Sequence, residues 1–165
     1  MNSILILSTG GTFNKVYNRK TGRLDIDPSF KAFQTIQESW LSNFNFDSII
    51  HKDSLEFTDK DRETLKSYLQ ATSFKKIAVV HGTDTIDKSA KFIADANLEK
   101  QIVFTGAMVP FSINPLEATA NLASAIGFLY GSSSNSVSIA INGRVNSFDK
   151  VVKNREAGYF ELYSN

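Results

Sequence analysis

Residues 76–85, which read Lys-Ile-Ala-Val-Val-His-Gly-Thr-Asp-Thr, decide the fold class. The first half is a short and almost continuous apolar run, and the second half is a polar turn that contains a glycine. An apolar run of this length before a turn is typical of a parallel strand that is buried on both faces. The sequence therefore predicts a strand over 76–81 with a polar loop at its carboxyl end.

Similar apolar runs recur along the chain, and helical patterns separate them. They predict further strands over 3–8, 46–51, 101–106 and 136–142. Strands that alternate with helices indicate right-handed crossovers and a parallel sheet. We therefore expect an α/β fold with a single doubly wound, mostly parallel sheet and helices on both faces. We also expect one domain over 1–165, because the sequence shows neither an internal repeat nor a linker.

The helices are predicted from their starting signals. Asp27 before a proline predicts the N-cap of a helix over about 28–43. Thr58-Asp-Lys-Asp61 resembles a capping box and predicts a second helix. We expect a third helix after residues 81–85, and a fourth over 114–131 that starts with Asn-Pro.

Composition excludes several classes of site. Hydrophobic residues make up 42% of the 165 residues, and the formal net charge is +1, so nothing favours a nucleic-acid or membrane partner. The absence of cysteine excludes disulfides and thiolate chemistry, and two histidines are too few for a usual histidine metal site. We therefore expect neither a metal nor an organic cofactor. No secretory leader or membrane span is evident in the sequence, so we expect a cytoplasmic protein.

Two polar loops follow predicted strands. Residues 8–12 read Ser-Thr-Gly-Gly-Thr, and residues 81–85 read His-Gly-Thr-Asp-Thr. Ligands of open α/β sheets bind outside the carboxyl ends of the strands, and glycine lets backbone approach a ligand closely. The pair fits a hydroxyl-nucleophile site, a phosphate cradle or plain turns; the usual phosphate-binding patterns are absent.

These loops resemble the two signatures of the bacterial-type asparaginase/glutaminase family. Residues 53–58, Asp-Ser-Leu-Glu-Phe-Thr, resemble its substrate-carboxylate loop. Residues 106–110 resemble its Gly-Ala-Met-Arg-Pro segment, with Val109 in place of the arginine. Lys153 falls where the family has a catalytic lysine. The resemblance covers nearly the whole chain.

The resemblance implies roles for particular residues. Thr12 corresponds to the primary nucleophile, and Thr83, Asp84 and Lys153 correspond to a second catalytic group. Lys153 would act either as a neutral base or as a charged donor that orients Thr83, and the sequence leaves both open. The implied substrate contacts include the backbone of the glycine turns as an oxyanion hole, and they involve Gly11, Ser54, Gly82, Asp84 and Ala107.

The sequence also departs from the family pattern. The family has a lid tyrosine shortly after the first threonine, whereas residues 20–25 here contain none, and Tyr17 is out of register. Leu55 replaces a polar residue that often follows the serine. The resemblance covers only the N-terminal half of the family's architecture, so we expect its C-terminal domain to be absent.

Two functions remain open at this stage: hydrolysis of L-asparagine, or a non-catalytic module that senses a small amino-acid ligand. We expect a homo-oligomer, a dimer or a tetramer, in which a neighbouring subunit closes the site. The aromatic-rich segment 158–163 favours an interface. The alternative is that this segment folds back onto its own sheet. We expect His81 to support its loop through hydrogen bonds.

Overall fold

The computed structural model describes residues 3–163. Its main sheet has six strands in the order β4-β1-β5-β6-β7-β8, and only the β7–β8 pair is antiparallel. The predicted mostly parallel α/β sheet is therefore confirmed. The strands are β1 (Ile4–Gly10), β4 (Asn45–Lys52), β5 (Lys76–Val80), β6 (Gln101–Thr105), β7 (Ser136–Ile141) and β8 (Arg144–Ser147).

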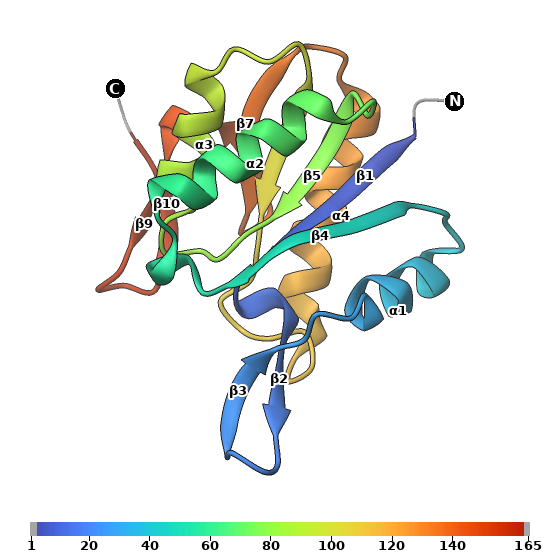
Figure 1. The fold of residues 1–165 in the computed structure, drawn as a ribbon, viewed down its shortest axis with the longest axis vertical. Helices are drawn as coiled ribbons and strands as arrows, with labels where there is room; N and C mark the ends of the chain where they lie inside the picture. The colour runs from blue at the N-terminus through green and yellow to red at the C-terminus, as the bar shows by residue number, and fades with distance from the viewer. Residues whose placement is uncertain (1–2, 164–165) are drawn as a thin grey trace.

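Helices cover both faces of this sheet, as predicted. Helices α2 (Asp59–Ala71) and α3 (Ile86–Asp95) pack on one face, and α1 (Lys31–Trp40) and α4 (Pro115–Gly131) pack on the other. In Figure 1, α2 and α3 lie in front of the sheet and α4 lies behind it.

Strand β1 shows why the two layers form. Ile4 and Ile6 belong to the core under α1 and α4, whereas Leu5 and Leu7 belong to the core under α2 and α3. All four side chains are at most 2% exposed. Burying such a side chain stabilises the fold by about 1.5–3 kcal/mol relative to exposure. A strand of this composition is stable only when helices cover it on both sides.

The capping signals were correct for two helices and wrong for one. Thr58 and Asp61 form the predicted capping box of α2, and the Asn114 side chain accepts a hydrogen bond from the Leu116 N–H at the start of α4. Helix α1, however, spans only Lys31–Trp40 rather than 28–43. The Asp27 side chain accepts from the Ser29 N–H instead, which makes a turn before the helix.

Strand β8, which forms an antiparallel hairpin with β7, was not predicted. Two further hairpins were not predicted either. The first pairs β2 (Lys15–Asn18) with β3 (Arg23–Ile26) and projects from the body of the molecule (Figure 1). The second pairs β9 (Val151–Asn154) with β10 (Tyr159–Leu162). The aromatic segment 158–163 therefore folds back onto its own chain, and Phe160 enters the core beside α3 at 5% exposure. The expectation that this segment needs a partner to cover it was wrong for Phe160.

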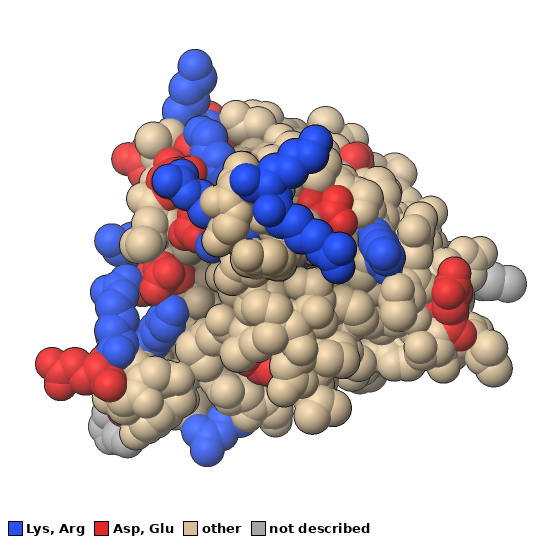
Figure 2. All heavy atoms as spheres, turned by 90° about the horizontal axis from the view of Figure 1, so that it is seen from below, with Lys and Arg blue, Asp and Glu red and all other residues tan. Residues whose placement is uncertain are grey.

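Charged residues are unevenly spread over the surface. Figure 2 looks onto the tip of the β2–β3 hairpin, and Lys and Arg gather on the upper half of this view among several acidic residues. The centre and the right of the lower half are mostly uncharged, whereas charged side chains lie at its left edge, at its bottom and at its right edge. Within residues 3–163, no helix combines the length and the apolar character that a membrane span requires.

Candidate active site

The predicted site loops lie at the point where successive strand connections run to opposite sides of β1. From β1 the chain passes to β4 on one side, and from β4 it passes to β5 on the other side of β1. Such a switch point leaves a crevice at the carboxyl ends of the strands, which is where ligands bind in open α/β sheets. The loops after β1, β4, β5 and β6 contain Thr12, Ser54, Thr83 and Ala107 respectively.

Glycines bring these loops into direct backbone contact. A Cβ atom on Gly11 would lie 2.5 Å from the Gly82 nitrogen, and one on Gly82 would lie 2.6 Å from the Ser54 Oγ. Gly11 also has a φ of +82°, which L-residues with a side chain rarely adopt. Any side chain at these positions would separate the three loops, so the glycines that the sequence singled out define the spacing of the crevice.

Ser54 is held by the loop that follows β5. It is 1% exposed, its Oγ accepts from the Asp84 N–H at 3.2 Å, and its carbonyl accepts from the Thr85 hydroxyl at 2.8 Å. Asp53 fixes the same turn from its other side by accepting from the Leu55 N–H. A hydroxyl has one donor hydrogen, and these contacts leave that of Ser54 free to bind a ligand oxygen.

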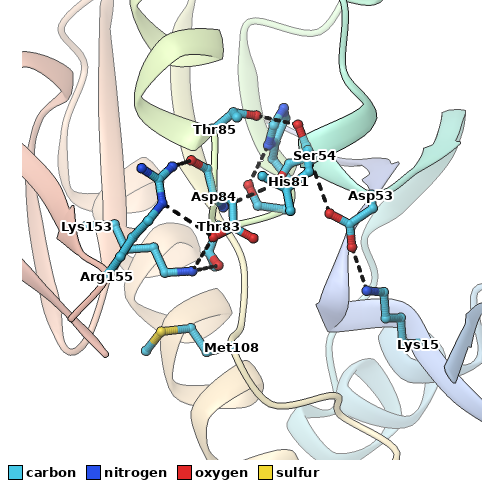
Figure 3. Close-up of polar contacts among 12 residues, drawn as sticks. Lys15, Asp53, Ser54, His81, Thr83, Asp84, Thr85, Met108, Lys153 and Arg155 are labelled. Carbon is cyan, nitrogen blue, oxygen red and sulfur yellow. Dashed lines mark hydrogen bonds and ion pairs between the residues drawn. The ribbon is translucent and has the colours of Figure 1, made fainter. Parts of the chain in front are cut away.

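Lys153 reaches the β5 loop from β9. Its Nζ lies 2.9 Å from the Thr83 Oγ1 and 2.8 Å from an oxygen of Asp84 (Figure 3). The neighbouring Arg155 donates to the Asp84 carbonyl at 2.7 Å and is the more exposed of the two cations. The structure thus brings together Thr83, Asp84 and Lys153. Thr83 is buried at 5% exposure.

Thr12 begins a single 3-10 turn, Thr12–Asn14, directly after the glycines. The two following side chains are buried, and Asn14 donates to the Ser8 hydroxyl at 3.0 Å, which anchors the turn. Thr12 itself is partly exposed, and within residues 3–163 its hydroxyl has no hydrogen-bond partner. The turn thus presents a hydroxyl that is free to contact a ligand, and activation of this hydroxyl would need a base that no described side chain supplies at hydrogen-bond distance.

Ala107 follows β6 in the fourth of these loops. The whole residue is buried and packs in the core with α4, so the structure does not expose this predicted contact residue to a ligand. Asn121 of α4 supports this loop by donating to the Gly106 carbonyl at 2.9 Å. Glu117 accepts from the N–H groups of Met108 and Val109, each at 3.0 Å, so α4 holds the segment in which the family arginine is replaced.

Lys15 is a site residue that the sequence analysis missed. Its Nζ lies 2.6 Å from the second carboxylate oxygen of Asp53 (Figure 3). Burial by itself would raise the pKa of Asp53, but the hydrogen bonds from Lys15 and from the Leu55 N–H outweigh it and lower that pKa. Lys15 belongs to no motif, and its role depends on a contact between segments that are distant in the sequence.

His81 supports the loop rather than facing the crevice. It is completely buried, and its Nδ1 lies 2.8 Å from the Gly82 carbonyl, while its ring contacts Phe57. Burial lowers its pKa to about 4, so the ring is neutral at pH 7. Across residues 3–163 no three His, Cys, Asp or Glu side chains are grouped so as to hold a metal ion.

The whole arrangement matches a known domain. The family described as "Asparaginase, N-terminal" matches residues 3–160. The chain belongs to the asparaginase family.

Several named or solved proteins are similar to this asparaginase-family chain. The probable periplasmic L-asparaginase of Haemophilus influenzae is 29% identical over 156 residues, which cover 87% of this chain and 44% of the relative. The L-asparaginase of Thermococcus kodakarensis shares the fold, with a TM-score of 0.85 at 21% identity, over 97% of this chain and 51% of that one. A probable cytoplasmic L-asparaginase of Campylobacter jejuni has a TM-score of 0.75 at 26% identity, over 97% of this chain and 52% of that one. The chain spans about half the length of these relatives.

Tyr17 does not take the place of the family's lid tyrosine. Tyr17 lies on β2 opposite Leu24 and is 62% exposed. Within residues 3–163 no hydrogen bond connects its hydroxyl to the crevice. The Tyr17 hydroxyl therefore does not contact Thr12 in this structure.

Proposed function

We propose that this chain hydrolyses the side-chain amide of L-asparagine to give L-aspartate and ammonia. The single observation that carries the proposal is the contact of Lys153 with both Thr83 and Asp84 beside the glycine turns. A lysine between a threonine hydroxyl and a carboxylate is an arrangement for activating a nucleophile or a water molecule. Membership of the asparaginase family supports the same class of reaction.

In the proposed reaction the Thr12 oxygen attacks the amide carbon. The carbon–nitrogen bond breaks, and the hydroxyl proton passes to the leaving nitrogen, so ammonia departs and an acyl ester remains on Thr12. Water then adds to the ester carbon and returns a proton to the Thr12 oxygen, which releases aspartate. Thr83 serves the second step by orienting that water. Because Lys153 forms an ion pair with Asp84, we assign it the role of charged donor to Thr83.

The substrate's charged groups fit the polar contacts of the crevice. The free hydroxyl hydrogen of Ser54 would donate to the α-carboxylate, and Asp84 would accept from the α-ammonium group. Backbone N–H groups of the Gly11 and Gly82 turns would form the oxyanion hole, where one donor is typically worth about 3–4 kcal/mol of transition-state stabilisation.

A non-catalytic sensor of asparagine or aspartate is the second candidate. One observation favours it: the Tyr17 side chain is 62% exposed and, among residues 3–163, makes no hydrogen bond to Thr12. An ammonia-release assay separates the candidates. We expect the purified protein to release ammonia from L-asparagine, more slowly from L-glutamine, and without an added metal or organic cofactor. Folded protein that binds asparagine but releases no ammonia above background would establish the sensor.

A homo-oligomer, either a dimer or a tetramer, is part of the proposal. A free amino acid carries two charges and needs a site from which water is excluded. The described residues supply contacts mainly from one edge of the sheet, so a second subunit would close the crevice. Exposed Leu162, the last residue of β10, and exposed Tyr163 after it support self-association near the strand that carries Lys153.

A further inference from the structure

Ser54, the proposed contact of the substrate's carboxylate, is adjacent to the negatively charged Asp53. This inference rests on the proposed function, in which Ser54 holds the α-carboxylate of an amino acid. The adjacent residue, Asp53, carries a carboxylate of its own at 30% side-chain exposure. Two like charges at neighbouring positions in a partly buried site repel each other strongly, because the effective dielectric constant there is well below that of water. The site therefore needs a cation beside Asp53.

Lys15 supplies this cation from the β2–β3 hairpin. The Lys15 side chain is only 20% exposed, and its Nζ lies 2.6 Å from Asp53. The residue is also fixed through its backbone: its N–H donates to the Thr12 carbonyl, and its own carbonyl accepts from the Ser112 hydroxyl at 2.7 Å. Lys15 thus connects the turn of the proposed nucleophile with the loop of the proposed carboxylate site.

We infer that Lys15 is a positioning residue that neutralises Asp53 and so allows the Ser54 loop to bind the α-carboxylate of the substrate. It acts through Asp53 and does not take part in bond making or breaking. The cations Lys15, Lys153 and Arg155 then exceed the two carboxylates, Asp53 and Asp84, by one charge, which favours an anionic ligand group. Removing Lys15 leaves two cations and two carboxylates. Because Lys153 and Arg155 contact Asp84, the carboxylate of Asp53 next to Ser54 then has no cation among the described residues in contact with it.

The experiment measures affinity for L-aspartate by calorimetry, together with KM and kcat for ammonia release. Lys15→Met keeps the length of the side chain and removes its charge. We expect it to weaken aspartate binding and to raise KM about tenfold or more, which corresponds to about 1.4 kcal/mol, with a much smaller change in kcat. Lys15→Arg retains the cation and should restore binding to within about threefold of the wild-type value. The control, Lys20→Met, changes an exposed lysine in the hairpin turn and should have no effect.

A double variant that removes the charges of both Lys15 and Asp53 tests whether Lys15 acts through charge or only supports the fold. Asp53→Asn keeps an acceptor for the Leu55 N–H but removes the charge that Lys15 neutralises. We expect Lys15→Met with Asp53→Asn to bind aspartate more tightly than Lys15→Met alone; equally weak or weaker binding would overturn the inference. Unchanged aspartate affinity in folded Lys15→Met, or no aspartate binding by the wild type, would also overturn it. If the wild type binds aspartate with the expected dependence on Lys15 but releases no ammonia, the inference stands and the hydrolase proposal fails.

Discussion

The Nζ of Lys153 lies 2.9 Å from the Thr83 Oγ1, although 70 residues separate the two in the sequence. Thr83 follows the central strand β5, whereas Lys153 belongs to the small β9–β10 hairpin. On this hairpin Phe160 is the residue directly opposite Lys153, and it is buried against the core. The position of the lysine therefore depends on the packing of an aromatic side chain outside the crevice.

Removal of either threonine hydroxyl should nearly abolish turnover. We expect Thr12→Ala and Thr83→Ala each to lower kcat by about two orders of magnitude or more, since each removes a group that acts in a coupled set. The double variant should be barely slower than the slower single variant, because groups that act as a unit are not additive. Steady-state ammonia release, with circular dichroism as the control for folding, measures this. Near-normal activity of Thr12→Ala would exclude it as the nucleophile.

The position of Lys153 can be tested through Phe160. Phe160→Ala removes a buried ring and should destabilise the protein by about 3 kcal/mol in urea unfolding. It should also lower kcat in protein that is still folded, since the hairpin no longer holds Lys153 beside Thr83. Tyr159→Ala is the matched control on the same strand, where the side chain is about half exposed, and it should change both quantities much less. Equal effects of the two substitutions would show that the hairpin does not depend on its buried face.

The sequence predicted the main sheet because burial on both faces leaves a clear pattern. Ile4 to Leu7 and Ile77 to Val80 are apolar at every position, since each side of the strand meets a helix. The hairpins were missed because β2 and β9 have only four residues each, contain a charged residue and are only partly buried. The hydrophobic pattern of a four-residue strand cannot be distinguished from that of a loop.

The candidate site was predictable only in part. The two glycine loops stood out because the sheet places strand ends side by side. Lys153 was identified through the family resemblance alone, since nothing in its local sequence indicates a contact with Thr83. The contact of Lys15 with Asp53 was missed because it depends on how two loops approach each other, and local sequence does not specify that distance.

His81 should make the stability of the protein depend on pH. Its pKa is about 4 in the folded protein against an ordinary value of 6.5, so the unfolded chain binds the proton first as pH falls. The stability from the neutral ring is therefore present above pH 6.5 and is lost as pH falls toward 4, by about 2 kcal/mol between pH 7 and pH 5. Urea unfolding across this range should show the loss in the wild type and in His51→Gln, whose ring is exposed. In His81→Gln this part of the pH dependence should be absent; an unchanged profile would contradict the assignment.

Self-association should be visible in solution. We expect light scattering of the active protein to give the mass of a dimer or a tetramer rather than that of one 18.3 kDa chain. Replacing Leu162 and Tyr163 by lysine places charge on an exposed apolar segment and should shift the distribution toward monomer. An active species with the mass of a single chain would rule out a site shared between subunits.

The close approach of Gly11 to Gly82, between the loops after β1 and β5, can be tested by comparing alanine substitutions at two glycines. Gly11 and Gly22 both have positive φ, +82° and +69°, but Gly11 also has a ψ of 179°, a conformation that is essentially restricted to glycine, so an alanine there carries a backbone strain of about 1–3 kcal/mol in addition to any clash. They also differ in their surroundings: a Cβ on Gly22 meets nothing within 4 Å, whereas one on Gly11 would lie 2.5 Å from the Gly82 nitrogen. Gly22→Ala should therefore cost only the strain of its positive φ and leave kcat unchanged. Gly11→Ala should cost more in urea unfolding and lower kcat at least tenfold in the folded fraction, because Thr12 and Thr83 are forced apart. Similar behaviour of the two variants would mean that the close approach of these loops does not determine the geometry of the site.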